Sequence, residues 1–226
     1  MKVLIFGATG MVGQGVLRET LLASDVTQVQ TLGRSETRMR HPKLREFVHM
    51  DLLDYRGIED ELVGFDACFF CLGASATGLD KAGYTRINHD IPVAAAQVLA
   101  RLNPSMTFTY VSGAGTGRQS AMWAKVKANT EQALLAMHFK AGYMFRPGVI
   151  QPLYGARSKT RPYDVFYRIT SPFLSIARRA WPDYVLSTED IGIAMLSATR
   201  RGTPPYILES RDIRRLVTWT GMSAVG

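Results

Sequence analysis

Three glycines near the beginning of the sequence have a spacing that can hold a phosphate group. Gly7, Gly10 and Gly13 stand in the stretch GATGMVG, which follows the apolar run KVLIF and precedes a segment of helical periodicity. In such a turn one glycine permits the tight bend, a second lets a pyrophosphate approach the backbone, and a third lets the helix pack on the strand. The N-terminus of the helix offers free N–H groups to the phosphates. The pattern therefore predicts a dinucleotide-binding turn rather than a purely structural one.

The end of the next predicted strand indicates which dinucleotide would bind. In NAD-binding folds an acidic residue at this place hydrogen-bonds the ribose 2′-hydroxyl, whereas an arginine accommodates a 2′-phosphate. The stretch QVQTLGRSETR places Gly33 at the acidic position and Arg34 directly after it, with Arg38 one turn further on. A guanidinium group suits a phosphate because its N–H donors form a planar fork. We therefore predict that NADP(H) is preferred over NAD(H).

A lysine lies on the apolar side of a predicted helix in the stretch SAMWAKVKANTEQAL, residues 120–134. Lys125 points away from this side, and helical spacing places the following residues on one stripe: Trp123, Lys127, Thr130, Leu134 and Met137. An ammonium group on an apolar stripe is destabilising unless it has a partner. Lys127 either extends along its neighbours toward water, as many lysines do, or has a specific role.

Strands and helices alternate along the chain, and this alternation predicts the fold. Apolar runs predict strands at residues 2–7, 28–33, 45–50, 66–73, 106–113, 142–148 and 204–210. Helical patterns are found at residues 11–24, 54–64, 91–103, 120–134, 187–202 and 211–221. The order is typical of an α/β fold, specifically a Rossmann-like, doubly wound parallel sheet with right-handed crossovers. We expect a single domain over 1–226, in which 151–226 forms a small C-terminal elaboration on the substrate side.

Composition excludes several other classes of protein. The chain has 226 residues with 46% hydrophobic and 20% charged residues, values of a globular protein. Neither a secretory signal nor a membrane-spanning stretch is found, so a cytoplasmic location is expected. Cys68 and Cys71 should point to opposite faces of one strand, which argues against a metal or redox pair, and no metal is expected. The net charge of +8 is spread along the chain without a nucleic-acid motif, so nucleic acid is not the expected partner.

With these residues in view, the sequence resembles the short-chain dehydrogenase/reductase superfamily, in its atypical or extended, NAD(P)H-binding branch related to nucleoside-diphosphate-sugar epimerases. The resemblance covers about residues 1–210 and rests on an ordered set of motifs rather than on one. These motifs are the glycine turn, MDLLD at residues 50–54, CLGAS at 71–75, YVSGAG at 110–115 and RPGVI at 146–150.

The resemblance implies a role for each motif. The segment after the third strand would border the adenine, the turn after the fourth would cover the ribose, and RPGVI would cup the nicotinamide. The cofactor-binding residues implied by the glycine turn and these motifs are Gly7, Thr9, Gly10, Met11, Val12, Gly13, Arg34, Asp51, Leu52, Leu72, Gly73, Ala74, Lys127, Pro147, Gly148 and Val149. Ser112 would be the catalytic serine.

In this superfamily a Y-x-x-x-K pair follows the serine, and here the pair reads Trp123-x-x-x-Lys127. The tyrosine would transfer a proton, and the lysine would hold the nicotinamide ribose and lower the tyrosine pKa. An indole donates only one N–H and cannot serve as an acid or base. Either another tyrosine, Tyr84 or Tyr154, replaces it, or Ser112 and water suffice, or the protein does not catalyse.

The expected function is accordingly an NADPH-dependent oxidoreductase or epimerase-like enzyme of unknown substrate. The alternative is a non-catalytic protein that senses the dinucleotide and recruits a partner, with Arg211, Arg214 and Arg215 as a candidate surface. A homodimer or a regulatory partner is left open. Tyr154, Tyr163, Phe166 and Trp181 suggest an apolar pocket on the substrate side, although packing explains them equally well.

Overall fold

A computed structural model describes residues 1–156, 174–204 and 206–222, and a parallel sheet of seven strands runs through its centre. The strand order is β3-β2-β1-β4-β5-β6-β9. The strands are β1 (Lys2–Phe6), β2 (Gln28–Gly33), β3 (Leu44–Val48), β4 (Ala67–Phe70), β5 (Thr107–Val111), β6 (Ala141–Arg146) and β9 (Ile207–Glu209). The order reverses between β1 and β4, so the cleft expected at such a switch point lies beside the glycine turn.

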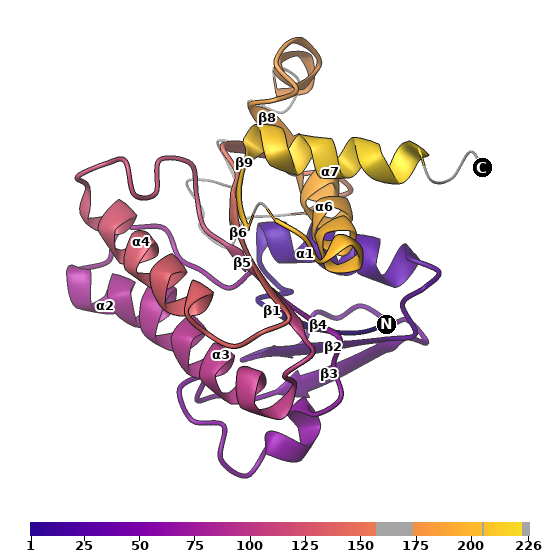
Figure 1. The fold of residues 1–226 in the computed structure, drawn as a ribbon, viewed down its shortest axis with the longest axis vertical. Coiled ribbons are helices and arrows are strands. Elements are labelled where there is room, and N and C mark those ends of the chain that lie inside the picture. The colour runs from indigo at the N-terminus through magenta and orange to yellow at the C-terminus, as the bar shows by residue number, and fades with distance from the viewer. Residues whose placement is uncertain (157–173, 205, 223–226) are drawn as a thin grey trace.

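Helices cover both faces of the sheet (Figure 1). One face carries α1 (Met11–Leu22), α6 (Thr188–Arg201) and α7 (Ser210–Met222). The other carries α2 (Lys81–Thr85), the π-helical turn η2 (Arg86–Asp90), α3 (Ile91–Leu102) and α4 (Met122–Leu135). Alternate residues of each strand feed the two layers: Val3 and Ile5 pack under α1 and α6, whereas Leu4 and Phe6 pack on the α3 side. This confirms the predicted Rossmann-like, doubly wound α/β fold.

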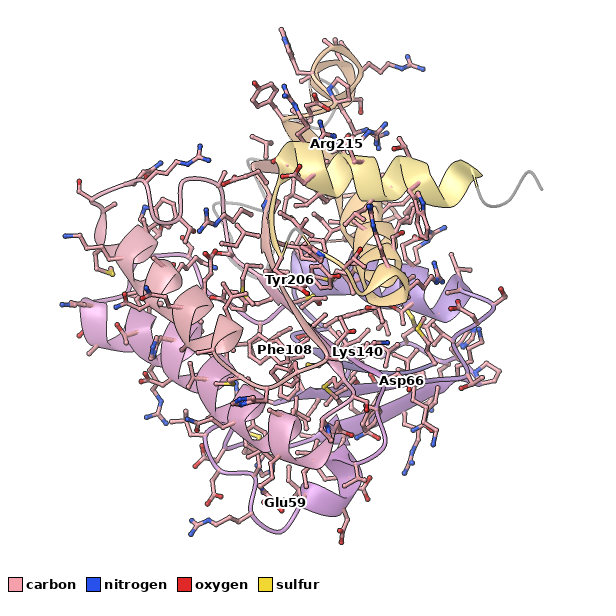
Figure 2. The ribbon with its side chains drawn as sticks, viewed as in Figure 1. Glu59, Asp66, Phe108, Lys140, Tyr206 and Arg215 are labelled. Atoms are coloured by element: carbon pink, nitrogen blue, oxygen red, sulfur yellow. The ribbon has the colours of Figure 1, made fainter. Side chains whose placement is uncertain are left out.

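The two helix layers are packed at close range. Figure 2 shows Phe108 of β5 in the interior, where its ring stacks on Phe70 and Phe139, and Glu59 at the rim. On the opposite face α1 and α6 approach closely because glycine lies at the contact. A Cβ atom added at Gly192 would lie 2.8 Å from the Cβ of Glu19. The absence of a side chain at Gly192 therefore lets α6 pack this closely against Glu19 of α1.

Caps and left-handed glycines fix where the C-terminal helix α6 begins and ends. Ser187 and Asp190 form a reciprocal capping box at its start, and Gly202 closes it at φ +63°. Serine satisfies an orphan backbone N–H at the start of a helix, and glycine adopts the left-handed conformation without strain. The helix predicted at residues 187–202 is confirmed with these caps.

One predicted helix is wrong. Residues 54–64 contain only the short 3₁₀ turn η1 (Glu59–Leu62). Asp54 does not cap a helix, because its carboxylate accepts hydrogen bonds from the backbone and guanidinium of Arg56. Gly57 has φ +81°, which no α-helix accommodates. The segment has a helical pattern, but the Asp54–Arg56 ion pair and the positive φ of Gly57 form a turn there instead of the first turn of a helix.

A short parallel ribbon outside the main sheet was not predicted. It pairs β7 (Val149–Gln151) with β8 (Val185–Ser187), which the chain joins through residues 152–184. Most of the segment 151–173, expected to be a loop plus a helix, lies outside the described residues, including Tyr163 and Phe166. Three-residue strands carry too little periodicity to be recognised in a sequence.

Cys68 and Cys71 are both free thiols and contact opposite layers of the fold. They can neither chelate one ion nor form a disulfide with each other, as the alternation along β4 predicted. Among the residues that the structure describes, no cluster of metal-ligating side chains is found. None of the helices in that part of the chain is long and apolar enough to cross a membrane.

Candidate dinucleotide-binding site

The glycine turn has the geometry that a phosphate cradle requires. Gly7 adopts φ +75°, and a Cβ atom there would lie 2.5 Å from the backbone N of Leu72. A Cβ atom at Gly13 would lie 2.1 Å from the carbonyl oxygen of Gly7. Gly10 differs, because its Cβ would meet only the Gly7 carbonyl oxygen, at 3.3 Å. Gly7 and Gly13 are thus required by the protein itself, whereas Gly10 leaves room for a ligand.

The helix α1 begins at this turn without a side-chain cap. Gly10 is its N-cap residue and makes no side-chain hydrogen bond to the first turn. The N–H groups of its first turn therefore receive no side-chain cap at Gly10, and anions bind favourably at such a helix end. A cavity of about 400 Å³ opens beside them. Its lining is formed by Gly7, Ala8, Thr9, Gly10, Thr31, Leu32, Gly33, Arg34, Ser35, Thr37, Met50, Cys71, Leu72 and Gly73.

A second cavity, of about 290 Å³, lies where the resemblance places the adenine. Asp51 and Leu52 line it together with Leu72, and Arg34 lines both this cavity and the larger one. Arg86 lines the second cavity from η2. The sequence reading missed Arg86, because only the fold brings η2 against the segment after β3. The structure thus places two arginines at the adenosine end of the cleft.

The turn after β4 is held by a buried asparagine that was also missed. Asn88 in η2 accepts a hydrogen bond from the backbone N of Ala74 at 3.2 Å and donates to the Ala74 carbonyl oxygen at 3.3 Å. The backbone carbonyl oxygen of Asn88 accepts hydrogen bonds from the hydroxyls of Tyr110 and Thr130, at 3.0 and 2.8 Å. A π-helical turn is a frequent mark of functional sites, but it leaves no pattern in a sequence. Through these hydrogen bonds Asn88 connects the turn after β4 with Tyr110 of β5 and Thr130 of α4.

Ser112 and Lys127 meet at the carboxyl end of β5. The Lys127 ammonium donates to the carbonyl oxygens of Val111 and Ser112 at 3.2 and 3.3 Å, and it lies 5.2 Å from the centre of the Tyr110 ring. Burial lowers the pKa of Lys127 to about 8, while the nearby Glu131 carboxylate opposes this shift. The Ser112 hydroxyl is buried and lies 3.1 Å from the Thr116 hydroxyl. Lys127 is therefore held at the site rather than extended into water.

Trp123 lies one helical turn before Lys127 and is half-buried. A Cβ atom added at Gly113 would lie 3.9 Å from the Cζ3 atom of its ring, so the indole packs beside the loop that follows Ser112. Along the predicted stripe Thr130 and Leu134 are buried and Lys125 is exposed, which confirms the helix register. The indole thus lies beside the loop that follows Ser112, one helical turn before Lys127.

The two tyrosines considered as replacements occupy other surroundings. Tyr84 is only 2% exposed, and burial raises the pKa of its hydroxyl. Tyr154 is 64% exposed at φ +54°, its ring lies under the Arg18 guanidinium, and its hydroxyl is 3.3 Å from Glu189. It borders a cavity of about 810 Å³ between α1 and the loop after β2, which shares Ala8, Thr9, Ser35 and Thr37 with the cleft at the glycine turn. Among the described residues, neither hydroxyl makes a hydrogen bond with Lys127 or Ser112.

The loop expected to cup the nicotinamide joins the same strand ends. The carbonyl oxygen of Pro147 accepts a hydrogen bond from the backbone N of Ala114 at 2.9 Å, which ties the loop to the segment after Ser112. The backbone N of Gly148 donates to the Ser210 hydroxyl at 2.8 Å. Val149 begins β7 and is 45% exposed. The structure thus brings Ser112, Lys127 and this loop together at the carboxyl ends of β5 and β6.

The fold and the site together define a Rossmann-type protein of the NAD(P)-binding kind. The chain belongs to the NAD dependent epimerase/dehydratase family, whose model matches residues 3–165. This confirms the resemblance to the epimerase-like branch of the short-chain dehydrogenase/reductase superfamily.

Two relatives illustrate its sequence neighbours. Protein HTATIP2 of Rattus norvegicus is 26% identical over 153 residues, which cover 66% of this chain and 62% of the rat protein. The mitochondrial protein FMP52 of Saccharomyces cerevisiae is 30% identical over 166 residues, which cover 71% of this chain and 69% of the yeast protein.

Two solved structures share the fold. An oxidoreductase of the short-chain dehydrogenase/reductase family from Burkholderia thailandensis has a TM-score of 0.71 at 18% identity, covering 99% of this chain and 97% of that one. The Bordetella bronchiseptica enzyme WbmF in complex with NAD+ has a TM-score of 0.68 at 17% identity, covering 96% of this chain and 76% of that one. At these identities the likeness concerns the fold.

The relatives correct one expectation. A cytoplasmic location was inferred from the absence of a secretory signal and of a spanning segment, but the fungal FMP52 proteins that the chain resembles are mitochondrial. The cytoplasmic expectation is therefore wrong. The reason is that the short apolar run at residues 3–6 argues only against secretion and has no bearing on mitochondrial location.

Proposed function

We propose that this protein is an NADP(H)-dependent oxidoreductase or epimerase-like enzyme that works through hydride transfer at the carboxyl end of β5. The observation that carries the proposal is Lys127. A lysine with two carbonyl partners, a pKa lowered to about 8 and a place beside Ser112 is more than a snorkelling surface residue. Perturbed pKa values of this kind cluster at functional sites.

The residues at this centre can hold a nicotinamide ribose and a substrate oxygen. A bound nicotinamide dinucleotide would supply the hydride transfer. An ammonium has three N–H donors, and the carbonyl oxygens of Val111 and Ser112 take two, which leaves one for a ribose hydroxyl. The Ser112 hydroxyl can turn from Thr116 toward a substrate oxygen. These two groups bind and orient without any contribution from Trp123.

The proton that a superfamily tyrosine would handle needs another route. Trp123 cannot titrate, so we assign the proton to water held by the Ser112 hydroxyl, with the Lys127 ammonium as the neighbouring positive charge. Acceptors that stabilise their own negative charge, such as quinones, demand least from protein acids. We therefore expect such acceptors to react faster than simple ketones.

The preference for NADP(H) rests on the adenosine end of the cleft. Arg34 is exposed there, Gly33 provides no carboxylate, and Arg86 lines the adjoining cavity. Neither arginine forms an ion pair with a residue that the structure describes. Both guanidinium groups are thus available to a 2′-phosphate.

Activity on a panel of carbonyls, quinones and nucleotide sugars tests the enzyme. We expect NADPH consumption with at least one member and a lower rate for Lys127→Ala, followed by absorbance at the reduced-nicotinamide band. Lys125→Ala is the control, because Lys125 is an exposed lysine of the same helix. A Lys127→Ala protein that turns over as fast as the control would contradict the assigned role.

A second candidate function is a non-catalytic dinucleotide sensor. It is favoured by Trp123, which cannot titrate, and by Tyr154, whose exposed ring lies under Arg18 rather than at Lys127. Tight NADPH binding without turnover across the panel, together with a partner that is captured only with NADPH present, would support it. The basic residues of α7 are a weak candidate for the partner surface, because Arg211, Arg214 and Arg215 each pair with an aspartate of this chain.

A further inference from the structure

A buried ion pair connects the helix that carries Lys127 with the loop expected at the nicotinamide. Arg146, at the end of β6, makes hydrogen bonds through Nε to both carboxylate oxygens of Glu131, at 3.0 and 3.2 Å, and its Nη2 contacts the same carboxylate. The side chains are 13% and 3% exposed. Glu131 follows Lys127 by one helical turn, and Arg146 directly precedes Pro147.

Other parts of the site meet at the same guanidinium. The Nη1 atom of Arg146 lies 3.2 Å from Glu209 of β9, which also accepts from Arg118 of the loop after β5 at 3.4 Å. A Cβ atom added at Gly117 would lie 3.6 Å from Nη2 of Arg146. Two strands, α4 and the loop that follows Ser112 therefore converge on Arg146.

We infer that Glu131 and Arg146 are positioning residues that fix Lys127 relative to the loop Pro147–Gly148. The inference rests on the proposed role of Lys127 in holding the dinucleotide. Glu131 acts in two ways: its backbone carries the next turn of the same helix, and its negative charge favours the protonated form of Lys127. Arg146 holds that carboxylate in place and ends β6 where the loop begins.

Stability alone does not account for this pair. Two charges removed from water lose much of their hydration, and buried ion pairs are often replaced by apolar side chains without loss of stability. We take this pair to fix one arrangement among several, a role that buried ion pairs have in some proteins. Here the arrangement that it fixes is that of α4 against the end of β6, which contains both halves of the proposed nicotinamide site.

The charged and titratable groups around Lys127 are few. Tyr110 faces it from β5, and Tyr84 lies next to Tyr110 from α2. Glu131 is on its own helix and is bound by Arg146 from β6. His89 and Asp90 of η2 pair with each other near the surface. Glu131 is therefore the carboxylate whose charge acts on Lys127.

The test is the pH dependence of NADPH affinity, measured by nicotinamide fluorescence between about pH 6.5 and 9.5, the range that brackets the pKa of Lys127. The wild-type affinity should fall as the pH rises through about 8, because Lys127 then loses its proton. In Glu131→Gln the fall should begin at lower pH, so that at pH 8 NADPH binds roughly three- to tenfold more weakly than to the wild type. Glu131→Asp, which keeps the charge, should retain the wild-type profile.

Two further variants keep the result decisive. Glu131→Gln/Arg146→Met removes the whole pair, so it does not leave a buried arginine with half its partners, and we expect it to fold with the shifted profile. Glu59→Gln changes a carboxylate that pairs with Arg101 near the surface, and it should leave the profile unchanged. If Glu131→Gln and Glu131→Gln/Arg146→Met both keep the wild-type affinity and profile, the pair is only structural and the inference fails. A wild type that binds no dinucleotide would instead overturn the proposed function itself.

Discussion

At the scale of a single residue, the proposed preference for NADP(H) depends on Arg34. It directly follows Gly33, the position at which NAD-specific proteins have a carboxylate, and it lines both cavities of the cleft. Arg34→Ala should weaken NADPH roughly tenfold or more, because a charge-assisted phosphate contact contributes about 1.5–3 kcal/mol. NADH should be affected little. Titration of both cofactors by nicotinamide fluorescence measures this, and equal wild-type affinities for the two would remove the basis of the assignment.

Trp123 offers an optical probe at the same scale. Its indole packs beside the loop after Ser112, one helical turn from Lys127, so it should lie near a bound nicotinamide. Indole emission overlaps the absorption of reduced nicotinamide, so NADPH should quench Trp123 by energy transfer. Trp123→Phe should remove most of the NADPH-dependent quenching with little loss of affinity. Quenching that survives in this variant would mean that Trp181 or Trp219 is the donor.

Trp123→Tyr addresses the chemistry of the same position. It rebuilds the Y-x-x-x-K pair with Ser112 and Lys127 in place, so we expect it to create or increase carbonyl reductase activity. Thermal unfolding of the variant, measured in parallel, distinguishes a variant that fails to fold from a folded variant that is inactive. A stably folded variant without any gain in activity would show that the indole does not occupy the position of the superfamily's tyrosine.

At the scale of elements, the turn between β1 and α1 separates glycines needed by the ligand from those needed by the fold. Gly10 has an ordinary extended backbone, and a Cβ there meets only one carbonyl oxygen, at 3.3 Å. Gly10→Val should therefore fold, with a nearly unchanged circular dichroism spectrum, but should bind NADPH at least a hundredfold more weakly because the side chain projects over the α1 N-terminus (about 2.7 kcal/mol). Normal NADPH binding by this variant would make the turn purely structural.

At the contact between α1 and α6, by contrast, a larger side chain in place of glycine should lower the stability of the fold. A Cβ at Gly192 would lie 2.8 Å from Glu19, so Gly192→Val forces the two helices apart. Overpacking of this kind destabilises by about 1–3 kcal/mol. Urea unfolding should show a lower midpoint for Gly192→Val than for Gly33→Ala, whose added Cβ meets nothing within 4 Å. A midpoint unchanged by Gly192→Val would mean that the helices separate at no cost.

The elements also show what a sequence can and cannot reveal. Buried parallel strands such as β1 and β4 are uniformly apolar, and α6 carries its own caps, so local patterns sufficed to predict them. The failures depend on contacts distant in sequence or on rare geometry. Arg86 and Asn88 join the site only because η2 folds back on the ends of β3 and β4, and a π-helical turn has no sequence signature. Residues 54–64 failed because an ion pair and Gly57 override a helical pattern.

At the scale of the whole molecule, the positive charge is distributed unevenly between paired and free groups. Arg200, Arg214 and Arg215 form ion pairs with aspartates of this chain, whereas Arg34 and Arg86 at the cleft form none within the described residues. These two guanidinium groups can therefore attract the phosphates of a dinucleotide bound in this cleft. Screening by salt should weaken that attraction more than it weakens the fold.

Lys127 links the site to the stability of the whole molecule. Its pKa is lowered to about 8 in the folded protein from 10.5 in an ordinary solvated lysine, so between these values the unfolded chain binds more protons than the folded one. Stability rises with pH wherever this holds. The penalty for burying the ammonium is therefore present in full below about pH 8 and disappears as the pH rises toward 10.5. Since Lys127→Met cannot titrate, the wild type should gain stability relative to this variant across that range.

The size of the gain and its control follow from the surroundings of the lysine. Because Lys127 is only partly buried as a residue and its ammonium has two carbonyl partners, we expect a relative gain on the order of 2 kcal/mol rather than the full value of the shift. Urea unfolding of both proteins without dinucleotide, at pH 7.5 and 10.5, measures it, and other titrating groups cancel in the difference. Lys125→Met, on the exposed side of α4, should show no such trend. A constant difference between wild type and Lys127→Met over this range would mean that Lys127 keeps the pKa of a solvated lysine, and its role at the centre would then lose its electrostatic basis.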